Sequence, residues 1–148
     1  MKTDQHRDLL ARKIRMLGIT PHVLSTLRGI HPFVETQMDG IVDRFYAHMQ
    51  TFPEGRRIFA DRAMVAGLKR AQREHWLNLF RGALDTDYVF RAMRVGQVPY
   101  ERRVAPYIYI AGYNFFQCEL LRILSEKYRS DSALPDMLGA ITRVISLD

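Results

Sequence analysis

The histidines are the first candidates for a functional site in this 148-residue sequence. A neutral imidazole can bind a metal ion, and it can accept or donate a proton near neutral pH. Four of the five histidines fall at expected helix ends or on polar faces, and we expect them to be solvated: His6, His22, His31 and His48. His75 lies instead among apolar residues at helical spacing. A lone histidine on such a face is more often a hydrogen-bonded core residue than a ligand, so we expect His75 in the core.

The single cysteine, Cys118, limits the kinds of site that the sequence can form. One cysteine excludes an internal disulfide and any zinc or iron–sulfur site built from several cysteines, which indicates a reducing compartment. A catalytic thiol needs a neighbouring base and a lowered pKa, and no pattern around Cys118 provides either. The simplest prediction is a small, buried, apolar side chain.

None of the short motifs that mark common catalytic sites occurs in the sequence. It has no G-x-S-x-G, no G-x-x-x-x-G-K-[ST], no H-E-x-x-H and no glycine-rich phosphate loop. The first 16 residues carry too many charges for a signal peptide, and no apolar stretch approaches the length of about 18 residues that suggests a membrane span. We therefore expect a cytoplasmic protein without enzymatic activity or a membrane span.

Length and composition predict one globular domain over residues 1–148, since 47% of the residues are hydrophobic and 11% aromatic. The 22 basic residues outnumber the 16 acidic ones, which gives a net charge of +6. The basic residues are scattered in groups of two or three, a pattern that favours solvated helix faces over a nucleic-acid surface. A basic nucleic-acid-binding helical domain is kept as an alternative, and its binding would depend steeply on salt.

Apolar residues recur at spacings of three and four along nearly the whole chain, which predicts an all-α fold. We expect a first helix with Asp4 as a possible N-cap and Gly18 as its stop. A second should begin at Thr20-Pro21 and end at His31-Pro32, because proline disfavours helix in the residue before it. A third is expected from Pro32 to about Thr51.

Four further helices are expected. One is capped by Asp61 and stopped by Gly82, and the next opens at Asp85 or Thr86 and ends near Pro99. A long apolar helix follows over residues 107–128, and the last begins at Leu134 without a stop signal, so we expect the natural polypeptide to continue. The long helix is expected to be apolar on both sides, so it should be either central to a core or shared with a partner. One side carries Tyr109, Ile110, Tyr113, Phe116, Leu120, Ile123 and Leu124, and the other carries Ile108, Phe115, Cys118 and Leu121.

Three segments together resemble the sensor domain of globin-coupled sensors: IVDRFYAHM (41–49), REHWLNLFRGALDTDY (73–88) and RVGQVPYERRVAPYIYIAGY (94–113). In that family an N-terminal globin controls a chemotaxis transducer, a histidine kinase or a nucleotide cyclase, especially a diguanylate cyclase. The resemblance covers most of the chain. It implies a globin-like fold with an extra N-terminal helix, a final helix that is truncated here, a covalently attached output domain, and a homodimer formed through the last two helices.

Carried over residue by residue, the resemblance assigns roles around a haem pocket. Tyr46 matches the tyrosine that hydrogen-bonds iron-bound oxygen, Leu68 a distal pocket position, and Tyr109 a tyrosine used in signalling. The full set of expected pocket residues is Tyr46, Phe45, Val42, Leu68, Gln72, His75, Met93 and Tyr109. The expected dimer interface consists of Ile108, Phe115, Leu121, Ile141 and Ile145.

The proximal position departs from the family, because Pro99 stands where the family has its haem-ligating histidine. Proline has no imidazole, and an axial histidine is what holds the iron in globins. His75 or the phenolate of Tyr100 is a conceivable substitute ligand. We therefore favour a sensory and dimerisation domain with no cofactor, like the haem-free sensor globins of stress-response regulators. A gas sensor that binds haem b through an unusual axial ligand is the alternative.

Overall fold

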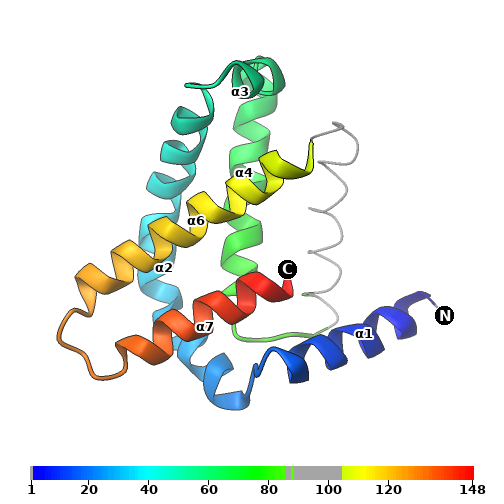
Figure 1. The fold of residues 1–148 in the computed structure, drawn as a ribbon, viewed down its shortest axis with the longest axis vertical. Helices are drawn as coiled ribbons and strands as arrows, with labels where there is room; N and C mark the ends of the chain where they lie inside the picture. The colour runs from blue at the N-terminus through cyan, green and yellow to red at the C-terminus, as the bar shows by residue number, and fades with distance from the viewer. Residues whose placement is uncertain (1, 86–87, 89–104) are drawn as a thin grey trace.

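The computed structural model describes residues 2–85, 88 and 105–148, and this part of the chain forms helices joined by short turns, with no strand. The all-α prediction is therefore confirmed for this part of the chain. Its helices are α1 (Lys2–Met16), α2 (Pro21–Met49), α3 (Pro53–Ile58), α4 (Arg62–Leu79), α6 (Pro106–Lys127) and α7 (Leu134–Leu147), drawn in Figure 1. The helix expected between Asp85 and Pro99 lies almost entirely outside the described residues. No described helix is long and apolar enough to cross a membrane.

The first helix, α1, projects from the other described helices in Figure 1. It begins at Lys2, so Asp4 lies in its first turn and the expectation that Asp4 caps the helix was wrong. The Asp4 carboxylate still stabilises the N-terminal end of α1, because the helix dipole is positive there. Gly18 follows the helix with a φ of 68°, the left-handed conformation that confirms it as the stop.

The second helix, α2, runs unbroken from Pro21 to Met49, so the expected break at His31-Pro32 was wrong. The predicted start is confirmed, because the Thr20 hydroxyl accepts a hydrogen bond from the Val23 amide at 3.3 Å. An interior proline costs a helix about 3 kcal/mol. Apolar side chains on both sides of Pro32 are almost fully buried in one stripe: Leu27, Ile30, Val34, Met38 and Ile41. Their burial stabilises by about 1.5–3 kcal/mol each, which outweighs the proline.

Local signals define the two helices that follow. The segment after Phe52, beyond the expected end of the preceding helix near Thr51, forms the short helix α3. The Asp61 cap of α4 is confirmed, since its carboxylate accepts from the amides of Ala63 at 2.9 Å and Met64 at 3.2 Å. The stop is confirmed too, because α4 ends at Leu79 and Gly82 has a φ of 67°.

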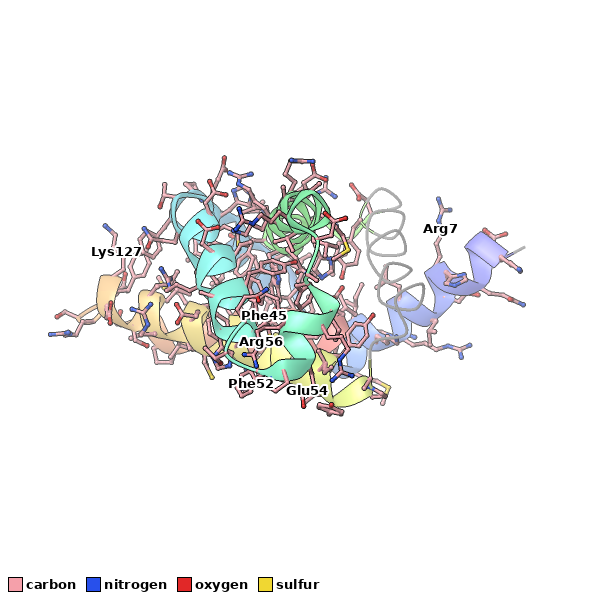
Figure 2. The ribbon with its side chains drawn as sticks, turned by 90° about the horizontal axis from the view of Figure 1, so that it is seen from above. Arg7, Phe45, Phe52, Glu54, Arg56 and Lys127 are labelled. Atoms are coloured by element: carbon pink, nitrogen blue, oxygen red, sulfur yellow. The ribbon has the colours of Figure 1, made fainter. Side chains whose placement is uncertain are left out.

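Helix α2 is the centre of the packing, and it contacts α3, α4, α6 and α7. Helices α6 and α7 contact each other and lie side by side in Figure 1. The largest fully buried side chains come from four helices and from Phe80, the residue after α4. The helical ones are Leu27, Val34, Met38 and Ile41 (α2), Trp76 and Leu79 (α4), Phe116, Leu120 and Leu124 (α6), and Ile141 and Val144 (α7). Figure 2 views this packing from above, with Phe45 inside the group of helices and Arg7 on the projecting α1. The core therefore brings α4 together with the α6–α7 pair.

Candidate functional site

Three polar side chains meet where α4, α6 and α7 converge. His75 Nε2 lies 2.7 Å from Oδ2 of Asp148, the residue after α7, and the Tyr113 hydroxyl of α6 donates to the same oxygen. The side chains of His75 and Asp148 are only 5% and 6% exposed. We call these three residues the His75 cluster. Its contacts join the far end of α4 to the end of α7.

The protonation of the cluster follows from its burial. Burial, and then the negative charge of Asp148, raises the pKa of Tyr113 above its ordinary value, and the same two causes raise the pKa of the buried Tyr88. The Tyr113 hydroxyl therefore stays protonated and donates. Because a carboxylate only accepts, we assign the proton of His75 to Nε2. Nδ1 of His75 is buried, with no hydrogen-bond partner among the described residues.

The residues expected on the distal side of the pocket are packed in the core. Tyr46 is 4% exposed, and its ring lies 5.1 Å from both Phe45 and Phe59, measured between ring centroids. Phe45 and Val42 are buried as well. These residues lie together in the core, an arrangement that suits core aromatics as well as a pocket wall.

The expected pocket residues of α4 and α6 are half-buried. Leu68 and Gln72 lie on α4, and Tyr109 lies near the start of α6, where burial raises its pKa. The Gln72 side-chain oxygen accepts a hydrogen bond from the Trp76 indole at 3.2 Å. The Trp76 ring stacks on Phe116 of α6 with centroids 4.6 Å apart. Met93, Pro99 and Tyr100 lie outside the described residues.

A pocket of about 300 Å³ opens between the end of α2 and the first half of α4. It is lined by Gln50, Phe59, Arg62, Val65, Ala66 and Lys69, none of which was expected to line the haem pocket. Lys69 pairs with Asp43 at 3.0 Å and lies 5.9 Å from the centre of the Tyr46 ring. The volume is at the lower end of the range for ligand pockets.

The residue at the expected proximal position does not fit standard haem ligation. The sequence has proline at position 99, and proline offers no donor to iron. His75 is the buried histidine of the five, and its Nε2 is bonded to Asp148. Among the described residues, no group of three or more His, Cys, Asp or Glu side chains is placed to hold a metal ion.

The residues expected at a dimer interface do not all reach the surface. Ile108, Phe115, Leu121 and Ile145 are half-buried, but Ile141 is 0% exposed, so its assignment to an interface was wrong. As the inner residue of α7, Ile141 packs in the core of its own chain.

Two expectations for α6 were wrong. Ile110 was expected on the same side as Phe116 and Leu120 but is 70% exposed, and Cys118 was expected to be buried but is exposed. The 3.6-residue period places Ile110 well around the helix from the buried Phe116 and Leu120. Tyr107, one turn earlier, is 62% exposed. Sequence reasoning missed this exposed strip because α6 is apolar nearly all round.

Comparisons with known proteins agree with the fold and the motifs. The chain is 28% identical over 123 residues to the heme-based aerotactic transducer HemAT of Halobacterium salinarum, a match that covers 82% of this chain and 25% of that protein. The globin domain of a Geobacter sulfurreducens globin-coupled sensor has the same fold, with a TM-score of 0.84 and 16% identity over 93% of this chain and 90% of that one. These matches confirm the predicted resemblance to sensor globins. Residues 6–148 match the family described as Protoglobin, and the chain belongs to that family.

Proposed function

We propose that residues 1–148 form a sensory and dimerisation domain that regulates an output domain in a bacterial signalling protein, without standard haem ligation. The relative from Halobacterium is by name a transducer, and the chain spans only about a quarter of its length. That length difference leaves room for an output domain in the relative. The output classes we propose are a diguanylate cyclase, a histidine kinase or a chemotaxis transducer. The domain itself is not an enzyme.

The observation that carries this proposal is the α6–α7 pair with an exposed apolar strip. Tyr107 and Ile110 are more than half exposed, and Ile108 and Phe115 add half-buried apolar surface to the same half of α6. Apolar surface of this kind marks a protein–protein contact when it is contiguous. A second copy of the chain would cover it in an isologous dimer, in which both subunits use the same surface. A shift of these helices across the two-fold axis would carry the signal.

Light scattering coupled to size-exclusion chromatography tests the dimer. We expect the mass of a dimer for the parent chain and of a monomer for Ile110→Glu, because the charge would be buried in the interface. Leu9→Glu is the matched control. Leu9 is an aliphatic residue of the same size as isoleucine and is also exposed, with 50% of its surface accessible, but it lies on α1. A monomeric parent chain, or equal behaviour of the two variants, would contradict the proposal.

The absence of standard haem ligation is tested by titrating the purified chain with hemin and recording the visible spectrum. Because Pro99 offers no donor, we expect the Soret band to remain that of free haem. Without haem, the pocket would instead bind an apolar or fatty molecule or a chromophore, or it would bind no ligand and be filled by core side chains. A shifted Soret band that saturates at one haem per chain would contradict this part of the proposal.

A second candidate, a haem-based gas sensor with an unusual ligand, is favoured by one observation. Nδ1 of His75 is buried and has no hydrogen-bond partner in the part of the chain that the structure describes, while Nε2 is bonded to a carboxylate. Metal-bound histidines are commonly oriented by such a second bond. Haem bound through this ring would give a shifted Soret band that disappears in His75→Ala. The variant therefore distinguishes the two candidates.

The alternative of a nucleic-acid-binding domain loses support because several basic side chains form ion pairs within the protein. Arg44, Lys69, Arg73, Arg81 and Arg122 each pair with a carboxylate. Paired cations leave less positive potential to attract phosphates. We expect no mobility shift of DNA or RNA at low salt, and a salt-sensitive shift would restore this alternative.

A further inference from the structure

We propose that the His75 cluster is a latch that holds the last turn of α7 against α4 and opens when α4 moves. The contact itself stands independently, and its role in signalling rests on the proposed sensory function. The latch residues are His75 on α4, Tyr113 on α6 and Asp148 after α7, which share the single acceptor oxygen Oδ2 of Asp148.

Helix α4 connects the latch to the expected pocket. Leu68, Gln72 and His75 follow each other at spacings of four and three, so they lie along one face of α4. Gln72 also bonds the Trp76 indole, and the Trp76 ring stacks on Phe116 of α6. A ligand or packing change that displaces the Leu68 end along the helix axis would therefore displace His75 as well.

The latch responds to small displacements because hydrogen bonds are short-ranged. The His75–Asp148 contact is 2.7 Å long, and a donor–acceptor separation beyond about 3.5 Å no longer makes a hydrogen bond. Shifts of 1–2 Å are common where helices move in regulatory transitions. A shift within that range is enough to break the bond from His75.

Opening the latch forces the last turn of α7 to move. With His75 withdrawn, the Asp148 carboxylate would remain buried with the Tyr113 hydroxyl as its single remaining donor in the cluster. A buried charge with too few partners is strongly disfavoured, so the carboxylate must swing into water. Val144 and Leu147 are the buried apolar anchors of the last turn, and they would loosen with it. The turn thus has two arrangements, one closed and one open.

Hydrogen exchange measured by mass spectrometry on the full chain tests the latch. Tyr113→Phe removes only the hydroxyl, and His75→Leu removes the imidazole donor. We expect exchange over residues 144–148 to become at least tenfold faster in both variants, with less than a twofold change over residues 134–140. His75→Gln, which keeps an N–H donor, should restore much of the protection. Equal acceleration along all of α7, or no change at its end, would overturn the proposal.

Arg44→Met is the matched control, because it breaks the Arg44–Glu119 pair between α2 and α6 and leaves the three latch residues intact. It should not change exchange over residues 144–148. If His75→Leu fails to fold by circular dichroism, Tyr113→Phe decides the question. Repeating the measurement in the Ile110→Glu background separates the latch from the dimer. If the latch variants still lose protection over residues 144–148 in this background, the latch is supported independently of the dimer. If the parent chain is also a monomer, the dimerisation part of the proposed function is rejected while the latch stands.

Discussion

His75 and Asp148 are 73 residues apart in sequence, yet their almost fully covered side chains meet at 2.7 Å. The pair joins α4 to the end of α7, and Tyr113 completes the contact from α6. In this fold α4 carries expected pocket residues, and α6 and α7 form the expected dimer surface. The pair therefore lies between the two parts of the molecule that a sensor must connect.

Stability should fall at high pH because of two tyrosines, the buried Tyr88 and the half-buried Tyr113. The pKa values of Tyr113 and Tyr88 are raised above the ordinary 10.0, so between about pH 10 and pH 11 only the unfolded chain ionises at these positions. Each tyrosine then lowers the free energy of unfolding by about 1.4 kcal/mol per pH unit. Their contribution to stability is complete below about pH 10 and is lost as the pH rises toward their folded-state pKa values.

Urea denaturation of Tyr113→Phe across this pH range checks the assignment. The variant should lose roughly half of the slope due to the two tyrosines, because one of two groups is removed. Tyr107→Phe removes an exposed hydroxyl from the same helix and should keep the slope of the parent protein. A parental slope in Tyr113→Phe would show that its hydroxyl ionises in the folded state.

Replacing Pro32 by alanine should stabilise the protein. Pro32 lies inside α2, where it lacks the N–H that would bond the carbonyl of Arg28, one turn earlier. Pro32→Ala should raise the free energy of unfolding by about 1–2 kcal/mol, less than the full cost of proline because the unfolded chain gains freedom. Pro21→Ala, at the first turn of the same helix, should be neutral or slightly destabilising. Urea titration decides, and a destabilising Pro32→Ala would contradict this view of α2.

Gly82 and Gly29 should respond to alanine in opposite directions. Gly82 has a φ of 67°, and a Cβ there would lie 2.4 Å from the Leu24 carbonyl oxygen, so Gly82→Ala should destabilise by about 1–3 kcal/mol. A Cβ at Gly29 would meet nothing within 4 Å, so Gly29→Ala should stabilise α2 by about 0.5–1 kcal/mol. Thermal denaturation of both variants measures the difference. If Gly82→Ala and Gly29→Ala had similar melting temperatures, the packing of α2 on the loop after α4 would be contradicted.

Pro99→His should introduce haem binding if the family motif is correctly aligned. The substitution supplies the imidazole that the resemblance places at this position. After hemin addition we expect a shifted Soret band at one haem per chain for Pro99→His and a free-haem spectrum for the parent. Tyr100→His, one residue out of register, is the control and should resemble the parent. A Soret band of equal size in both variants would mean that the motif does not define the proximal position.

Helix ends were predictable from sequence where a local residue determines them. Thr20 and Asp61 cap their helices through their own side chains, and Gly18 and Gly82 adopt the left-handed conformation that ends a helix. These interactions span three or four residues, so the sequence contains all the information they need. The family motifs likewise identified the fold, because they preserve the order and spacing of a known chain.

The tertiary structure alone decided which local signals are overruled and which distant residues meet. Pro32 is a strong local breaker, but burial of the stripe around it in α2 outweighs the lost hydrogen bond. Ile110 and Cys118 are apolar residues on the outer side of α6, and sequence cannot say which side of an apolar helix faces the core. The contact between His75 and Asp148 depends on how α4 crosses α7. Its physical reason is the packing of three helices, which no local pattern records.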